Sequence, residues 1–211
     1  MFEGGDVQVG ELSKDGIVIT QELYDTAGDY YGEVFQYCID NGIAPAQLHV
    51  EDRIDLSHIV PGWYGYADAW VYNPTTNTIV VWDFKAGHRL VEAVDNWSLV
   101  LYAEGIKMQH FPLLSPAPNF DLRIVQPRGF HRDGTVRKWQ YGPEQHMVLY
   151  FAVAAGVKAA IQDAPTCIVS SHCKTCSARA HCDTALRNAY EGVDYVGQLV
   201  THNLTGQSLG V

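Results

Sequence analysis

The chain has 211 residues, of which 47% are hydrophobic and 18% are charged, a composition typical of globular proteins and not of disordered ones. This length is sufficient for one sizeable core with a small appendage. The net charge of −10 and the pI near 5.2 exclude a global attraction to nucleic acid. A polyanionic substrate would therefore need a local basic patch or a metal ion.

The sequence also bears on the compartment. No apolar run approaches the roughly 18 residues that a membrane span needs, and the first six residues lack the basic and apolar regions of a signal peptide. We therefore expect a cytoplasmic protein without membrane contact. Four of the five cysteines lie between Cys167 and Cys182. In a cytoplasmic protein, this clustering indicates a metal site rather than disulfides.

The chain opens with a segment, 1–19, that is rich in glycine and acidic residues and that we expect to be flexible. Thr20 is an N-cap candidate for a helix that ends near Asn41-Gly42. The apolar stripe of this helix includes Cys38, which predicts a buried core thiol, with a ligand role as the alternative. The following residues, 47–56, alternate like a half-buried strand.

A hairpin is predicted next. Two β-rich runs flank the turn sequence Asn73-Pro74-Thr75-Thr76-Asn77. If the hairpin is symmetric about this turn, Val71 faces Val80 and Asp68 faces Asp83. Directly opposed residues in an antiparallel pair have Cβ atoms about 5 Å apart, so the register brings two carboxylates together.

The second strand of the hairpin adds a cation to the same patch. Side chains alternate along a strand, so Asp83 and Lys85 share one face while Trp82 and Phe84 take the other. Two facing anions repel, and a divalent cation would neutralise both. The alternative is a pair of ordinary surface acids, but the apolar residues on both sides favour a function for buried charge.

The helix expected after the hairpin, over 92–105, carries Ser98 and Tyr102 at i and i+4, which places them on one side. A later helix, over 144–163, is apolar on nearly all sides, so we expect it to be largely buried. The remaining predicted elements are a strand over 120–126, a short helix over 183–190 and a loosely held tail over 191–211.

One basic segment stands out in this acidic chain. It predicts either contact with phosphate groups or a solvated loop. Its five cations, set against Asp133 alone, are Arg123, Arg128, Arg132, Arg137 and Lys138.

The arrangement Gly-x-Ala-Asp, turn, hydrophobic run, Asp-x-Lys-x-Gly and then a helix with a tyrosine resembles the PD-(D/E)XK nuclease superfamily. Within it, the chain is most similar to the RecB-like exonuclease branch and its phage-encoded relatives, over about residues 50–183. Asp68 matches the first acid, Asp83 and Lys85 match the (D/E)-x-K element, and Ala67 stands in place of the nominal proline.

This resemblance implies an α/β fold, with a restriction-endonuclease-like core over 20–165 in which helices flank a mixed central sheet. It also implies phosphodiester hydrolysis that depends on Mg²⁺ or Mn²⁺, with a metal-activated water as nucleophile. Asp68, Asp83 and the backbone carbonyl of Phe84 would be the metal ligands, and Lys85 would orient the water. Glu51, on the preceding strand, would support the metal or Lys85, with a solvated strand edge as the alternative.

The resemblance implies DNA as the partner, as a single strand or a duplex end, contacted by Ser98, Tyr102, Gln126 and Arg128. Ser98 occupies the glutamine position of the branch's Gln-x-x-x-Tyr pattern. A recombination protein would be a further partner, in the bacterial host cytoplasm if the protein is phage-encoded.

One departure concerns the N-terminal helix of that branch, which carries a metal-binding histidine in a Gly-x-x-x-His context. No histidine precedes His49 in this sequence, and Glu33 is the candidate for a helix-borne acid in its place. The lost histidine leaves open a catalytically weak DNA-binding or recombination-accessory protein on the same fold. A second alternative is a structural zinc protein in which the aspartate pair is incidental.

The cysteines form a second motif, Cys167-x5-Cys173-x2-Cys176-x5-Cys182, within a predicted module over 166–190. Four thiolates can hold a structural zinc or an iron–sulfur cluster. The last three are similar in spacing to the trio that holds a [4Fe–4S] cluster in RecB-like iron–sulfur nucleases. The resemblance therefore implies such a cluster, with Zn²⁺ as the alternative and Cys167 or Cys38 as the fourth ligand; free thiols without a ligand role are the remaining interpretation.

Overall fold

A computed structural model describes residues 8–13 and 16–191 of the chain. The chain divides into two compact units, with the boundary between Lys158 and Ala159, close to the end expected for the core. The tail predicted over 191–211 lies outside the described residues except for residue 191, which ends a helical stretch over 183–191. This stretch confirms the short helix predicted after the cysteines.

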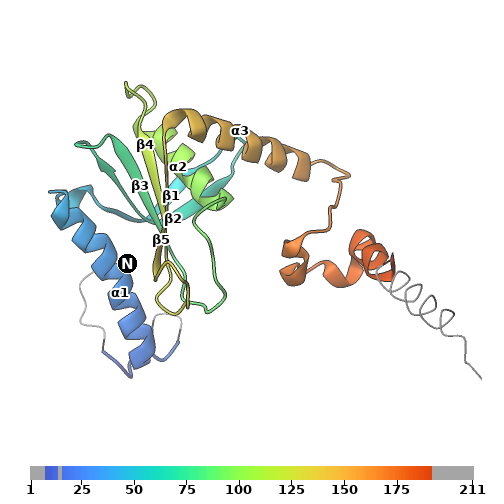
Figure 1. Ribbon diagram of the computed structural model, residues 1–211, viewed down its shortest axis with the longest axis horizontal. Helices are drawn as coiled ribbons and strands as arrows, with labels where there is room; N and C mark the ends of the chain where they lie inside the picture. Colours follow the sequence, from blue (N-terminus) through green and yellow to red (C-terminus); the bar gives the residue numbers. More distant parts are fainter. Residues whose placement is uncertain (1–7, 14–15, 192–211) are drawn as a thin grey trace, which may run out of the picture. The chain divides into compact units, whose positions relative to one another are not determined.

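The first unit is built on a five-stranded mixed sheet of order β1-β2-β3-β4-β5 (Figure 1). All neighbouring strands pair antiparallel except β3 and β4, which are parallel. The fold is thus the mixed α/β architecture that was predicted. Its strands are β1 (His49–Asp55), β2 (Tyr64–Asn73), β3 (Thr78–Phe84), β4 (Asn119–Val125) and β5 (Val136–Tyr141).

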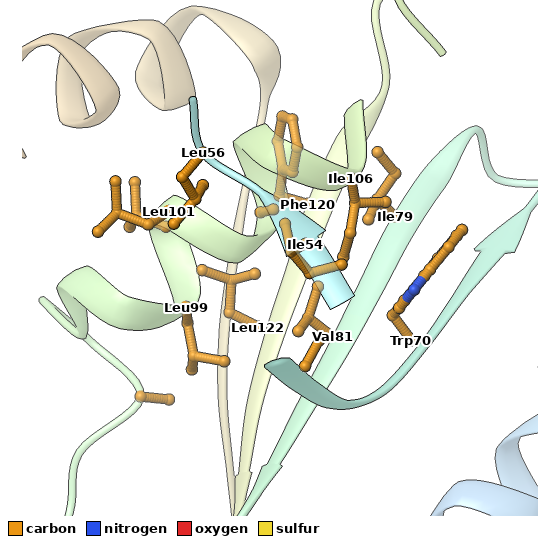
Figure 2. Close-up of a cluster of buried hydrophobic side chains, with 14 of the residues drawn as sticks. Ile54, Leu56, Trp70, Ile79, Val81, Leu99, Leu101, Ile106, Phe120 and Leu122 are labelled. Carbon is orange, nitrogen blue, oxygen red and sulfur yellow. The ribbon is translucent and has the colours of Figure 1, made fainter. Parts of the chain in front are cut away.

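Helices cover both faces of this sheet. On one face, α1 (Gln21–Asp40) packs Val34 and Cys38 against Val71, Val80 and Trp82. On the other face, α2 (Trp97–His110) and α3 (Pro143–Ala160) enclose the larger core. Figure 2 shows its centre, where α2 contributes residues such as Leu99 and Ile106. Burying a side chain of this size contributes about 1.5–3 kcal/mol, so the sheet is held from both sides.

The α1 helix forms where the sequence predicts it. The Thr20 side chain accepts a hydrogen bond from Leu23 N–H at 3.1 Å, which satisfies one of the unpaired donors of the first turn. The helix ends at Asn41 and Gly42, and Gly42 has a φ of +65° that favours glycine. Cys38 is buried against the sheet, and burial raises the pKa of its thiol. The prediction of a core thiol is confirmed.

Two helices differ from their predictions. Helix α2 starts at Trp97 instead of Glu92, because the Asn96 side chain caps it by accepting from Leu99 N–H. Helix α3 is not largely buried: Val148 and Phe151 are 69% and 62% exposed. The sheet supplies a surface for one stripe of α3 only. The apolar residues on its outer side therefore have no counterpart in the first unit.

The basic segment also differs from a plain loop, because part of it forms β5. This strand was not predicted. It is only six residues long, and its alternation of polar and aromatic residues is too short to stand out within a basic segment. In the N-terminal segment, Leu12 and Val18 form an isolated β-bridge. Among the described residues, none of the helices combines the length and apolar character needed to cross a bilayer.

Candidate active site at the fork of the sheet

The predicted hairpin register is confirmed, with Val71 opposite Val80. One register step beyond the last β2–β3 pair, Asp68 and Asp83 stand opposite each other, but the ladder between their strands has ended. From there β2 continues beside β1 only, and β3 continues beside β4 only. The sheet therefore opens into a fork at the two acids.

Asp68 occupies the mouth of this fork. Its Oδ2 accepts a hydrogen bond of 2.6 Å from the Phe84 N–H, so the carboxylate satisfies a backbone donor that the strand ladder leaves without a partner. Its Oδ1 makes no hydrogen bond among the described residues. We call Asp68, Asp83, Phe84 and Lys85 the fork cluster.

Asp83 and Lys85 share the α2 side of the sheet, as alternation predicts. The Lys85 Nζ lies 2.7 Å from Asp83 Oδ2. Phe84 turns to the α1 side, where its ring centroid is 5.1 Å from that of Tyr30. Burial raises the pKa of Asp83, and the Asp68 carboxylate adds to the rise while Lys85 opposes it. One lysine thus leaves the pair of acids under-neutralised.

Two tyrosines bracket the fork cluster from opposite faces of the sheet, Tyr30 from α1 and Tyr102 from α2. Burial raises the pKa of both phenols, and the carboxylates of Asp68 and Asp83 raise it further. The Tyr30 hydroxyl is buried and has no hydrogen-bond partner in the described structure. A buried hydroxyl without a protein partner is a polar group that a bound ion or ligand could satisfy. Sequence reasoning missed Tyr30, because it sits on the apolar stripe of its helix.

Tyr102 reaches the fork across a glycine. A Cβ atom on Gly65 would lie 2.5 Å from the Tyr102 Cε1, a distance at which the ring must move. The glycine of the Gly-x-Ala-Asp motif therefore makes room for the tyrosine of the following helix. Ser98 lies one turn earlier on α2 and is exposed, on the same helix as Tyr102 as predicted.

Glu51 lies on β1 in a strained conformation. The β1–β2 pairs on either side place it opposite Asp68, yet these two residues form no ladder pair. Its φ of +49° lies in the left-handed region, which costs a non-glycine residue about 1–2 kcal/mol. The side chain is exposed, and its charge contributes to the raised pKa of Tyr30. Strain of this kind concentrates at functional sites.

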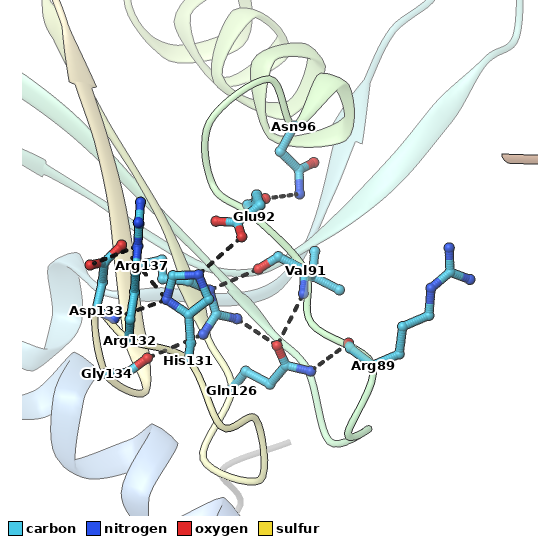
Figure 3. Close-up of polar contacts among 10 residues, drawn as sticks. All are labelled: Arg89, Val91, Glu92, Asn96, Gln126, His131, Arg132, Asp133, Gly134 and Arg137. Carbon is cyan, nitrogen blue, oxygen red and sulfur yellow. Dashed lines mark hydrogen bonds and ion pairs between the residues drawn. The ribbon is translucent and has the colours of Figure 1, made fainter. Parts of the chain in front are cut away.

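Gln126 was predicted to contact substrate, and the structure corrects this. It is fully buried, and its Nε2 donates to the backbone carbonyl of Gly87 and to that of Arg89 (Figure 3). Its Oε1 accepts from the Val91 N–H and from Arg137. The amide is fully used in holding the loop that follows Lys85, so Gln126 positions this loop instead of reaching a substrate.

The basic segment contributes less to the surface than predicted. Arg123 is buried between Asp121 and Glu33, at 2.6 and 2.7 Å, and Arg137 is buried with its Nε donating to the Val91 carbonyl. Neither can contact phosphate. The same ion pair commits Glu33 to Arg123, so the idea that Glu33 replaces a metal-binding histidine is wrong.

The other cations of the segment remain accessible. Arg128 is about one-third exposed, with its Nε 2.8 Å from Glu22 Oε1 and a guanidinium nitrogen 3.0 Å from His88 Nε2. Arg132 and Lys138 are exposed. His131, beside Arg132, bonds Glu92 at 3.0 Å (Figure 3). Two polar contacts, Arg128 with His88 and His131 with Glu92, therefore join the loops that follow β3 and β4.

The fork cluster fits a hard divalent cation. Mg²⁺ is commonly bound by one or two carboxylates and retains several waters. Two opposed carboxylates and the backbone carbonyl of Phe84, the residue after Asp83, are oxygen donors of this kind. Among the described residues, no three His, Cys, Asp or Glu side chains are gathered as an all-protein metal cage would require. The donor set thus suits a partly hydrated ion rather than a closed zinc site.

The second unit carries the cysteine motif. Its four cysteines are free thiols, with Cys167 and Cys176 exposed and Cys173 and Cys182 partly covered. Two short 3₁₀ turns, η2 (Ser171–Thr175) and η3 (Arg179–His181), lie between the cysteines. In the described part of this unit the thiols are not drawn together around one point. A metal or cluster would have to gather them on binding.

Comparison with known proteins gives a family and two distant structural likenesses. No curated protein matches the chain. A "Putative exonuclease" from Eubacterium rectale is 9% identical with a TM-score of 0.38, over 79% of this chain and 70% of that chain. The protein SSO0001 is 14% identical with a TM-score of 0.32, over 76% of this chain and 82% of that chain. Likenesses this remote carry no argument about function.

The family match extends over nearly the whole sequence. Residues 6–205 match the model of a family described as "Protein of unknown function (DUF2800)". The chain therefore belongs to the DUF2800 family.

Proposed function

We propose that this protein is a nuclease that hydrolyses phosphodiester bonds of DNA with the help of Mg²⁺ or Mn²⁺, and that it acts as an exonuclease. The observation that carries the proposal is the fork cluster. Two opposed carboxylates and one lysine lie where two strands separate, with more negative charge than the lysine neutralises. The resemblance of the Asp-x-Lys motif to PD-(D/E)XK nucleases supports the same function.

In this proposal Asp68 and Asp83 hold the metal ion through their carboxylate oxygens, with the Phe84 carbonyl as a third donor. The bound ion would lower the pKa of a coordinated water and stabilise the charge that builds on the phosphate. The Lys85 ammonium is 38% exposed and has three N–H donors, one of which faces Asp83. The remaining donors can orient a water or a phosphate oxygen in front of the carboxylates.

Substrate positioning falls to the groups around the fork cluster. Tyr102 and Ser98 offer hydroxyls on one side of α2, and Arg128 offers a partly exposed guanidinium at the end of β4. Because the chain is acidic overall, these few contacts and the metal must supply most of the attraction to a phosphate backbone. Glu51 would support the metal from the neighbouring strand.

The test is cleavage of end-labelled single-stranded and duplex DNA in the presence of Mg²⁺ or Mn²⁺. We expect Lys85→Ala and Asp83→Asn to reduce the rate by about 10²–10³-fold, the loss found when one preorganised charge stabiliser is removed. Lys158→Ala, an exposed lysine on α3, is the matched control and should cleave at the wild-type rate. A circular single strand distinguishes an exonuclease, which leaves it intact, from an endonuclease.

Two outcomes would contradict the proposal. If wild type and Lys85→Ala leave all substrates equally intact, the enzymatic function is wrong, and DNA binding without cleavage would favour the accessory role. If both cleave at the same rate, the activity does not come from the fork cluster.

For the second unit, we propose that the four cysteines hold a [4Fe–4S] cluster, with zinc as the alternative. The spacing of the thiols supports this, and their free state leaves them available as ligands. Metal binding and local folding are coupled in small cysteine modules. Visible absorption and metal analysis of anaerobically purified protein test it: colourless protein with one zinc contradicts the cluster, and protein without either metal contradicts both.

A further inference from the structure

Three side chains form an exposed patch on the β1–β2 arm of the fork. Arg53 stands opposite Tyr66 in the strand register, and its Cζ lies 4.2 Å from the centre of the Tyr64 ring. The two tyrosine rings are 5.9 Å apart and nearly perpendicular, at 89°. Each aromatic ring is thus fixed by a neighbour. We call Arg53, Tyr64 and Tyr66 the tyrosine patch.

The tyrosine patch lies on the face of the sheet that α2 does not cover. Along β2, Gly65 and Ala67 contact the α2 side, since Gly65 lies against Tyr102 and Ala67 belongs to the α2 core. Alternation therefore turns Tyr64 and Tyr66 to the opposite face. They are 48% and 51% exposed, so the first unit leaves about half of each side chain to solvent.

Distance links the tyrosine patch to the fork cluster. Tyr66 precedes Asp68 by two residues, which corresponds to about 7 Å along a strand. Tyr64 lies the same distance further out. A polymer that lies along β2 on this face would therefore meet Tyr64, then Tyr66, and then Asp68 at the mouth of the fork, while Asp83 and Lys85 lie on the α2 side.

We propose that the tyrosine patch is a stacking platform for the unpaired bases of a single-stranded nucleic acid whose backbone runs to Asp68, at the mouth of the fork. This inference rests on the proposed function and names the form of substrate that the site takes. Every base has a π-face, and stacking on an aromatic side chain does not depend on sequence. In a duplex the bases already stack on one another, so only an unpaired strand can use the platform.

The charge of the patch fits the same ligand. Arg53 is the only cation among the three residues, and a guanidinium can pair with a phosphate oxygen or extend the stack. Because the whole chain carries a net charge of −10, electrostatic attraction alone gives little affinity for a phosphate backbone. Stacking on Tyr66 and Tyr64 supplies an attraction that salt does not screen.

The experiment measures binding of the full chain to labelled oligonucleotides by fluorescence anisotropy, with EDTA present so that no strand is cut. Three probes of about 12 nucleotides, within the range of single-strand site sizes, are compared: oligo-dT, an abasic strand with the same backbone, and a blunt duplex. The variants are Tyr66→Ala, Tyr66→Phe and the control Phe151→Ala, an exposed aromatic on α3.

We expect Tyr66→Ala to bind oligo-dT about 10-fold more weakly, the loss of one base–aromatic stack, and Tyr66→Phe to stay within about 2-fold of wild type. Wild type should bind the abasic strand at least as weakly as Tyr66→Ala binds oligo-dT, because an abasic strand cannot stack on Tyr64 either, and Tyr66→Ala should not weaken abasic binding further. Phe151→Ala should match wild type. Thermal unfolding of each variant checks that it is folded.

Three results would overturn the inference: equal binding of oligo-dT by wild type and Tyr66→Ala, equal binding of abasic and intact strands, or tighter binding of the duplex than of the single strand. Each of these is compatible with Lys85-dependent cleavage, so the inference can fail while the nuclease stands. Conversely, Tyr66-dependent base binding without any cleavage would contradict the nuclease alone.

Discussion

Two groups of acidic residues, one between α1 and the sheet and the other on the sheet itself, have opposite surroundings. Asp121 and Glu33 surround Arg123, whose guanidinium bonds both of them, and Gln140 fills a remaining position on Asp121. In the fork cluster, Asp68 and Asp83 share a single lysine, and the neighbouring Tyr30 hydroxyl has no partner. In the first group the acids are neutralised by Arg123 and hydrogen-bonded within the group. In the second group, one lysine does not neutralise both acids.

The comparison distinguishes structural charge from charge available to a ligand. A buried ion pair with every position filled holds elements together, here α1 to the sheet, and has little capacity for anything else. Acids that face each other without sufficient countercharge destabilise the fold, so their presence calls for a ligand that neutralises them. The predictions below test this contrast, from the largest expected effect to the smallest.

Arg123→Met should cause the largest loss of stability. It leaves Asp121 and Glu33 as uncompensated acids against the sheet, a change that typically costs about 3–5 kcal/mol. Urea unfolding measures it, with Arg132→Met as control, since Arg132 is 88% exposed in its side chain and should change stability by about 0.5 kcal/mol or less. A loss below about 1 kcal/mol for Arg123→Met would show that this group does not hold the helix.

Gly65→Ala should cost about 1–3 kcal/mol, as overpacking does, because the new methyl group meets the Tyr102 ring. A double-mutant cycle with Tyr102→Ala should remove most of this cost, since the clash disappears with the ring. Gly28→Ala, in α1 with open space around the position, should be neutral or stabilising. Additive effects of Gly65→Ala and Tyr102→Ala would contradict the contact.

Addition of Mg²⁺ or Mn²⁺ should stabilise the wild type and not Asp83→Asn. At ten times the dissociation constant, an ion that binds only the folded state adds about 1.4 kcal/mol, which thermal unfolding detects as a raised Tm. Asp40→Asn, an exposed acid at the end of α1, should keep the response. An equal shift in wild type and Asp83→Asn would indicate that the ion binds elsewhere.

The same variant gives a pH dependence in the absence of metal. The pKa of Asp83 is raised above its ordinary 3.8, first by burial. The Asp83 carboxyl therefore binds its proton more tightly in the folded state than in the unfolded state. The stability that this protonation contributes is lost as pH rises above 3.8. The free energy of unfolding of Asp83→Asn minus that of wild type should increase with pH in this window and then level off. A flat difference would contradict the raised pKa.

Glu51 gives the smallest expected effect. Glu51→Gly removes the cost of a left-handed residue, about 1–2 kcal/mol, against the added chain entropy of glycine, about 0.5–1 kcal/mol. Glu51→Ala removes the same charge and keeps the strain. The free energy of unfolding in urea should therefore be about 0.5–1 kcal/mol higher for the glycine variant than for the alanine variant. The reverse order, which is usual within strands, would mean that the backbone at Glu51 is extended in solution.

Much of the fork cluster could be predicted because it depends on local rules. The turn chemistry of Asn73 to Asn77 and the alternation of side chains fix which residues oppose each other, so the pairing of Val71 with Val80 was correct. The Thr20 cap and Gly42 likewise set the ends of α1 from neighbouring residues. The apolar pattern of α3 predicted burial and was misleading, because a helix pattern does not specify how many partners surround it.

What the sequence by itself determined about this protein is the hairpin and the position of its two acids and lysine on it. Only the tertiary structure decided which charges are available. Arg123 and Glu33 are 90 residues apart, and Gln126 and Gly87 are 39 apart; such pairs follow from packing between distant elements and leave no local pattern. The same packing brings Tyr30 and Tyr102 to the fork from opposite faces, because side chains on separate helices meet only when the sheet lies between them.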